Sequence, residues 1–160
     1  MLKQSSKKYL TVSEENKRFL LSQGDLLVAR TGATYGQTLY IETEEPAIFA
    51  SFLIKLHLDN SQITNRYYWH FSKSNSYWKQ AERMVTNGGQ QQFNANVLEK
   101  IQIPLPPLNI QNRIVEALDN FDKICSDLKI GLPAEIEKRQ QQYEFYRNKL
   151  LTFKDRISNE

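Results

Sequence analysis

Cysteine is nearly absent from this sequence of 160 residues, because Cys125 is its only one. A single cysteine excludes an intramolecular disulfide and favours a reducing compartment, so we expect a cytoplasmic protein. The two histidines, His57 and His70, stand thirteen positions apart, and neither has a second ligand one helical turn away. No stretch approaches the roughly 18 consecutive apolar residues of a membrane span. These absences argue against a disulfide scaffold, a metal site and a membrane protein.

Signatures of catalysis are missing as well. The sequence contains no G-x-S-x-G element, so nucleophilic catalysis is not indicated. The loop from Gly32 to Thr38 is only superficially similar to a phosphate-binding loop, because its glycine spacing is one residue short and its lysine is missing. Asp119 and Asp127 could be cited for nuclease chemistry, but Asp127 falls on a predicted helix where such charges usually form a solvated face. We therefore predict no catalytic residue, no metal and no cofactor.

The excess of positive charge is small. The chain has 21 Lys and Arg residues against 18 Asp and Glu residues, which gives a net charge of +3, and 40% of its residues are hydrophobic. This composition suffices for one compact domain plus an appendage and is not that of a disordered chain. The basic residues concentrate in two separate stretches of the first hundred positions. Such a distribution permits an anionic partner such as nucleic acid without requiring one.

The first half of the sequence has the patterns of a sheet and short helices. Two runs rich in β-favouring residues, at 26–29 and 37–41, flank a short loop with two glycines, which predicts a β-hairpin. The segment 52–58 alternates apolar and polar residues, which predicts a half-buried strand. Its inner face would carry Phe52, Ile54, Leu56 and Leu58. Aromatic residues between 64 and 85 fall near helical spacing and predict one or two short helices.

The period changes after the prolines at 104, 106 and 107. Apolar residues then recur at intervals of three and four from Ile110 to Leu128, the pattern of an amphipathic helix. A second helix is predicted to begin at Pro133, with an apolar stripe that continues to Ile157. Such a stripe would be a liability if exposed, so we expect this helix to pair with another helix or another chain. Its expected interface residues are Ile136, Tyr143, Tyr146, Leu150 and Phe153.

These patterns together predict an α/β (α+β) head with a mixed sheet over residues 1–107, followed by a long helical tail of coiled-coil type over residues 108–160. The glycine loop beside Arg30 is either a plain turn with positive φ or a close contact to a DNA backbone. The glutamine loop at 90–92 is either a solvated turn or a reader of base edges.

The basic and aromatic stretch from Tyr67 to Arg83 also has two interpretations. It forms either core helices whose cations reach the surface or a face that binds nucleic acid. We predict that most of its aromatic rings pack in the core. The full set of predicted DNA contacts is Arg30, Thr31, Tyr35, Lys79, Arg83, Gln91 and Gln92.

Three segments, taken in order, resemble a known family. They are the run from Gly24 to Gly32, the proline segment from Ile103 to Leu108 with Gln111 after it, and the stretch from Gly131 to Leu151. In this order the chain is similar to the specificity subunit of type I restriction-modification enzymes. The resemblance implies one target recognition domain followed by the conserved helical region of that family.

What the resemblance implies is a non-catalytic reader of double-stranded DNA. Its head would enter the major groove at one half of a bipartite site, while its helices would act as a spacer and bind the methylation and restriction subunits. A full specificity subunit resembles two such units in tandem, whereas one is present here, and only residues 1–23 precede Gly24.

Two hypotheses follow from this difference. In the first, two copies form a homodimer through the helix at 133–157 and read two identical half-sites. In the second, the head is incomplete at its start and the chain is a non-functional remnant of a specificity subunit. An alternative from a different class is a non-catalytic module for helical oligomerisation or protein interaction.

Overall fold

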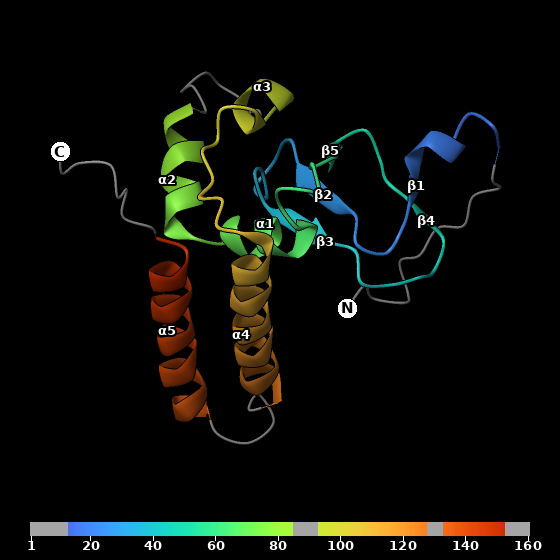
Figure 1. The fold of residues 1–160 in the computed structure, drawn as a ribbon. Coiled ribbons are helices and arrows are strands. Elements are labelled where there is room, and N and C mark those ends of the chain that lie inside the picture. The colour runs from blue at the N-terminus through green and yellow to red at the C-terminus, as the bar shows by residue number, and fades with distance from the viewer. Residues whose placement is uncertain (1–12, 85–92, 128–132, 153–160) are drawn as a thin grey trace.

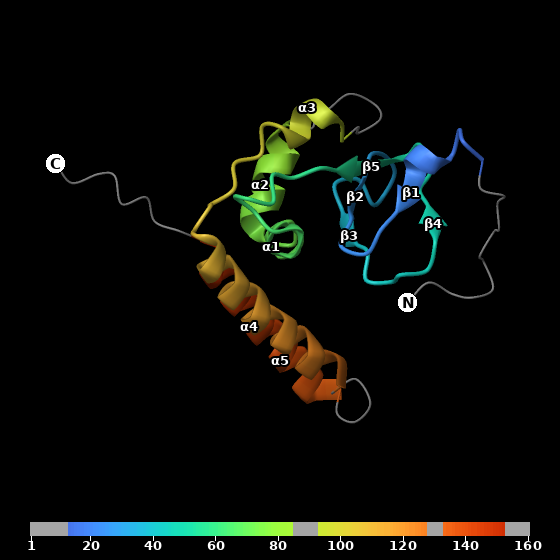
Figure 2. The ribbon, with the colours of Figure 1, turned by 45° about the vertical axis from the view of Figure 1, so that its right-hand side comes forward.

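The protein consists of a head of short strands and short helices, from which two long helices project side by side (Figures 1 and 2). The computed structural model describes residues 13–84, 93–127 and 133–152. A mixed α/β head with helices after it agrees with the expected fold class. A long coiled-coil tail is not confirmed, because the helical part is a pair of helices that lie against each other. The assignment of DNA binding to 1–107 and of spacing to 108–160 stays a prediction.

The described strands form two small antiparallel sheets. One pairs β1 (Leu20–Leu21) with β4 (Ala47–Ile48). The other has the order β3-β2-β5, built from β3 (Thr38–Tyr40), β2 (Leu26–Ala29) and β5 (Leu53–Leu56). The expectation of a mixed sheet is therefore wrong. A parallel pair needs a long crossover, usually a helix, and the segments between these strands contain none.

The predicted β-hairpin is confirmed, with Leu27 of β2 opposite Leu39 of β3. The loop between the strands contains two glycines with positive φ, 82° at Gly32 and 74° at Gly36. A Cβ at Gly36 would also lie 3.3 Å from the Trp78 ring. Glycine at this position is thus required by both the backbone and the packing.

β5 begins one residue later than the alternation predicts. A turn precedes it, in which the Leu53 N–H donates to the Ala50 carbonyl over 3.0 Å. Phe52 belongs to this turn, and 60% of its surface is exposed. The expectation that Phe52 lies on the inner face is wrong, because the turn takes the residue out of the alternating pattern of the strand.

The aromatic stretch forms two short helices, as predicted. A short 3-10 helix at Lys17–Phe19 lies earlier in the chain, before β1. α1 (Asn65–Phe71) is capped by Thr64, whose side chain accepts a hydrogen bond from the Tyr67 N–H. α2 (Asn75–Met84) and α3 (Ala95–Leu98) complete the head. Most aromatic rings of this stretch pack in the core, and the fully buried rings of the head are Tyr67, Phe71, Tyr77 and Phe93.

The two long helices are α4 (Leu108–Asp127) and α5 (Pro133–Leu150). They pack against each other along their length (Figure 2). Cys125 and Tyr143 are buried in the core cluster that includes both helices, and the rings of Phe121 and Tyr146 stack with centroids 5.9 Å apart. In the described part of the stripe, Tyr146 therefore packs against α4 of the same chain, and Tyr143 belongs to the core cluster that includes α4.

Candidate nucleic-acid interface

The three-stranded sheet has two ends with different neighbours. At one end Ala29 lies opposite Leu53, so the β2–β3 loop and the turn before β5 come together there. We call this the loop end, and it comprises residues 30–36, residues 50–52 and Phe93. The opposite end lies beside α1 and α4, and we call it the joint end.

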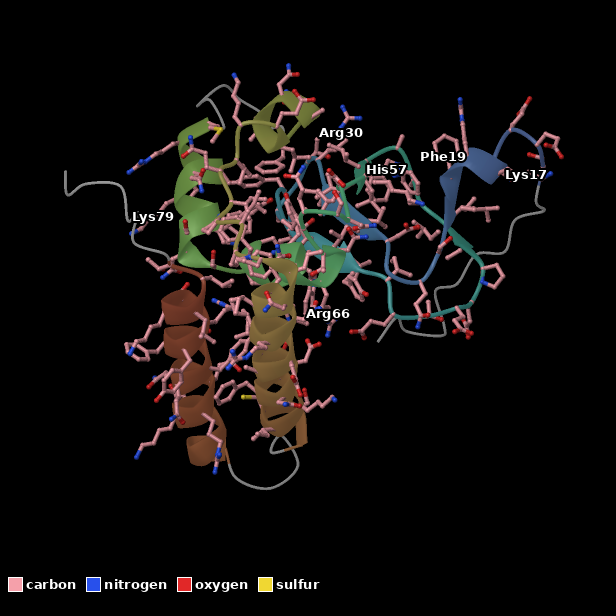
Figure 3. The ribbon with its side chains drawn as sticks, viewed as in Figure 1. Lys17, Phe19, Arg30, His57, Arg66 and Lys79 are labelled. Atoms are coloured by element: carbon pink, nitrogen blue, oxygen red, sulfur yellow. The ribbon has the colours of Figure 1, made fainter. Side chains whose placement is uncertain are left out.

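Arg30 connects the segments of the loop end. Its N–H donates to the Phe52 carbonyl over 3.0 Å, and its own carbonyl accepts from the Phe93 N–H over 2.7 Å. Its guanidinium Nη1 donates to the Ser51 carbonyl over 3.2 Å. The side chain is exposed, and no carboxylate in the described part of the chain pairs with it. Arg30 thus presents a positioned cation at the loop end (Figure 3).

The glycine loop combines packing with an open tip. Tyr35 is half-buried, with its ring 6.2 Å from Trp78 and 6.5 Å from Phe93 between centroids. Thr31 is also half-buried. A Cβ at Gly32 would meet nothing within 4 Å, so the backbone there is open to close approach by another molecule.

The other predicted contacts do not all gather at this end. Lys79 and Arg83 are exposed on α2, and Figure 3 places Lys79 on the outer side of that helix, away from Arg30. Gln91 and Gln92 lie outside the described residues. The residue that follows them in sequence, Phe93, is hydrogen-bonded to Arg30.

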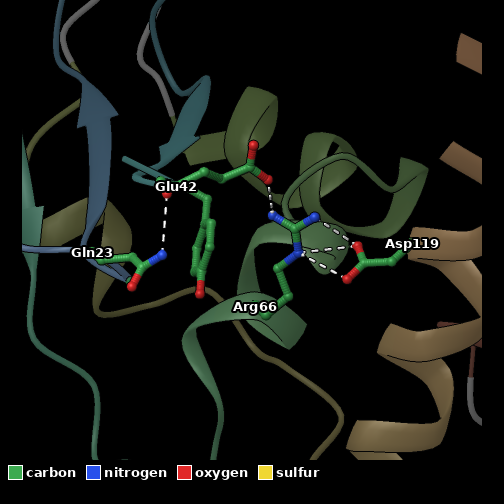
Figure 4. A pocket seen from close by; sticks show the side chains of 6 residues that line it. Gln23, Glu42, Arg66 and Asp119 are labelled. Atoms are coloured by element: carbon green, nitrogen blue, oxygen red, sulfur yellow. Dashed lines mark hydrogen bonds and ion pairs between the residues drawn. The ribbon is translucent and has the colours of Figure 1, made fainter. Parts of the chain in front are cut away.

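At the joint end a polar cluster ties the head to α4 (Figure 4). Arg66 on α1 donates to Asp119 on α4 from Nε over 3.0 and 3.2 Å and from Nη2 over 2.7 Å. Its Nη1 donates to Glu42 over 2.7 Å. The guanidinium also lies over the rings of Tyr40 and Trp69, 4.8 and 4.2 Å from their centroids. Arg66 is thereby held between α4 and the end of the sheet at Tyr40 and Glu42.

Two further side chains extend this network. His70 is fully buried with Nε2 2.8 Å from Asp119 Oδ1, and burial lowers the pKa of His70 to about 4. Lys73 lies 3.7 Å from Asp122, and burial lowers the pKa of Lys73 to about 8.

A metal-like grouping of ligand atoms is part of the same network. His70, Asp119 and Asp122 offer potential ligand atoms within 4.8 Å of one another. Arg66 and Lys73 already pair with the two carboxylates, so the geometry is that of an ion-pair network. Asp119, which was considered for nuclease chemistry from the sequence, instead links α4 to α1.

Gln111 fixes the start of α4 to the head. Its Nε2 donates to the carbonyls of Gln62 and Pro106 over 2.7 and 2.9 Å, and its Oε1 accepts from the Thr64 N–H over 3.0 Å. The side chain is fully buried. This role was not predicted from the sequence. The one signal that could have indicated it is an amide side chain in the first turn of a predicted amphipathic helix.

The predicted interface residues on α5 differ in their surroundings. Tyr143 is buried, Leu150 is half-buried and Tyr146 stacks on Phe121 of α4. Ile136 belongs to α5, and Phe153 lies outside the described residues. None of the described helices is long and apolar enough to cross a membrane.

The protein thus has two parts. An α/β head exposes its loop end, and its joint end is attached to a helical hairpin. Residues 2–138 match the family model described as the type I restriction modification DNA specificity domain. The chain belongs to this family.

Curated relatives agree with this assignment. A protein named as a type I restriction enzyme specificity subunit from Haemophilus influenzae is 35% identical over 133 residues, which covers 82% of this chain and 32% of the relative. The specificity subunit of a type I restriction enzyme from Escherichia coli is 36% identical over 102 residues, or 62% of this chain and 25% of the relative. The MpnII specificity subunit from Mycoplasma pneumoniae is 37% identical over 46% of this chain and 23% of its own length. The matches thus cover about a third or less of these relatives.

Proposed function

We propose that this chain is the DNA sequence-recognition component of a type I restriction-modification complex. It directs the methylation and restriction subunits to a bipartite DNA site, acts in the cytoplasm and leaves catalysis to those partners. The observation that carries the proposal is the family match over residues 2–138. The loop end, which presents Arg30 away from the helical hairpin of α4 and α5 (Figure 3), supports it. A separate protein-interaction module is not favoured by the family match.

In this proposal the loop end of the head faces the DNA. Arg30 binds a guanine edge or a phosphate, because its guanidinium makes one hydrogen bond, to Ser51, and no ion pair within the described residues. Thr31 and Tyr35, both half-buried, contact the DNA beside the open tip at Gly32. Lys79 and Arg83 bind phosphates from α2, and Gln91 and Gln92 read base edges.

We also propose that two copies pair through α5, so that one complex carries two heads. The helical hairpin leaves large apolar side chains exposed, with exposed fractions of 62% at Phe145 and 37% at Tyr146 on α5 and 45% at Ile124 on α4. A two-fold pair through α5 would cover such side chains and present two identical half-site readers.

Binding measurements at several salt concentrations test the DNA proposal. The chain, in complex with its methylation subunit, is titrated onto a fluorescent duplex while anisotropy is recorded. We expect Lys79→Ala to weaken binding to all sequences alike and to reduce the salt slope by about one. Lys138→Ala removes an exposed cation on α5 and serves as the matched control. Affinity that is indifferent to salt in the unmodified complex would contradict DNA recognition.

A further inference from the structure

The loop end carries an exposed aromatic ring that no pattern in the sequence marks as a contact. Phe52 lies in the turn between Ala50 and Leu53 with 60% of its surface exposed. Its carbonyl accepts from the Arg30 N–H, and the carbonyl of Ser51 accepts from the Arg30 guanidinium. One short turn therefore carries the ring and holds the guanidinium.

Exposure alone says little, because single apolar side chains are common on protein surfaces. The placement of Phe52 is the informative part. Its carbonyl is bonded to the N–H of Arg30, the residue after β2, and the turn is closed by the bond from the Leu53 N–H to the Ala50 carbonyl. The cation next to it has no carboxylate partner in the described part of the chain, and the tip at Gly32 is open. An exposed ring and an exposed cation, carried by two hydrogen-bonded segments, are arranged to meet a second molecule.

The chemistry of the pair indicates what that molecule presents. An aromatic ring has no donor or acceptor for a phosphate, whereas the major groove offers the thymine 5-methyl group as an apolar target. Arginine takes the O6 and N7 acceptors of guanine in the same groove. A phenylalanine also loses little conformational freedom on binding, since it has few rotatable bonds.

We propose that Phe52 is a specificity-determining residue that contacts the 5-methyl group of a thymine, next to the base or phosphate bound by Arg30. This inference rests on the proposed DNA-recognition function. It adds a residue from a segment that is distant in sequence from both predicted loops.

The test compares Phe52→Ala, Phe52→Leu and the unmodified chain, each in complex with the methylation subunit. Leu105→Ala is the matched control, because Leu105 is 54% exposed and lies outside the loop end. The probes are a duplex with the motif that the complex methylates and a scrambled duplex. We expect Phe52→Ala to weaken binding to the motif between about 5-fold and 100-fold and to leave the scrambled duplex unchanged. Phe52→Leu keeps an apolar contact and most of the affinity.

Replacing each thymine of the motif in turn by deoxyuridine removes one methyl group at a time. One replacement should weaken binding of the unmodified chain and have no effect on Phe52→Ala. Equal binding of the motif by Phe52→Ala and the unmodified chain, or an equal loss on both duplexes, would overturn the inference while the proposed function stands. If the unmodified complex does not distinguish the two duplexes, the proposed function fails and the inference fails with it.

Discussion

At the scale of single residues, Gly32 and Gly36 of the same loop are constrained differently. Both have positive φ, which costs an L-residue about 1–2 kcal/mol. Only Gly36 is also enclosed, by Trp78 and Phe93 at 3.3 and 3.4 Å from a Cβ position. We expect Gly36→Ala to lower the free energy of unfolding by about 1–3 kcal/mol more than Gly32→Ala, because it adds overpacking. Urea unfolding of both variants measures the difference, and equal losses would contradict the packing role.

The buried His70 predicts how stability depends on pH. Its pKa falls from the ordinary 6.5 to about 4 on folding, chiefly because burial disfavours the charged ring. Between these two pKa values the unfolded chain binds a proton at His70 and the folded chain does not. His70 therefore costs no stability above pH 6.5, and its effect lowers the free energy of unfolding as the pH falls toward 4. The loss is on the order of 3 kcal/mol.

Urea unfolding between pH 7 and pH 4 provides the measurement. His70→Gln should flatten the pH dependence in this window, whereas the exposed His57→Gln should leave it unchanged. A free energy of unfolding for the unmodified chain that is constant between these pH values would show that His70 is not buried as described.

At the scale of elements, one carboxylate on α4 pairs with two side chains of α1. Asp119 accepts from both Arg66 and His70, and its side chain is only 26% exposed. Asp119→Ala leaves those two groups without this partner, and we expect a loss of about 2–4 kcal/mol in unfolding free energy. Glu42 binds the same guanidinium but is 69% exposed, so Glu42→Ala should cost about 0.5 kcal/mol. Equal losses of unfolding free energy for the two variants would contradict the larger role of Asp119.

Elements with strong local patterns were predictable from the sequence. The two glycines and the flanking β-rich runs were enough to predict the β2–β3 hairpin, and the spacing from Ile110 onward was enough to predict α4. β1 and β4 are two residues long, so they have no periodicity to detect. The antiparallel pairing of β2 with β5 depends on contacts between distant segments, which a local pattern does not contain.

Part of the candidate site was likewise predictable from local sequence patterns, and part was not. Arg30 stands beside a recognisable glycine loop and could be named in advance. Phe52 reaches it only through hydrogen bonds between segments about twenty positions apart in sequence. The alternation of residues 52–58 even suggested the opposite orientation for this ring.

At the scale of the whole molecule, the exposed apolar side chains of the helical hairpin bear on the number of subunits. In a two-fold pair each copy would bury a Phe145 ring, which contributes about 1.5–3 kcal/mol when fully covered. We expect Phe145→Asp to weaken the pair at least about tenfold and to leave the helix content intact, since the ring is exposed in one chain. Analytical ultracentrifugation and circular dichroism measure the two properties. An unmodified chain that stays monomeric at high concentration would contradict pairing.

The central claim is that this chain selects the DNA sequence for partner enzymes. Its most direct test is to express the chain with the methylation and restriction subunits of its own source in a host that lacks them. Long-read sequencing then maps methylated adenines across the host genome. We predict methylation at one recurrent bipartite motif, palindromic if two identical copies act together. Absence of any recurrent methylated motif, with the chain soluble and bound to the methylation subunit, would contradict the account.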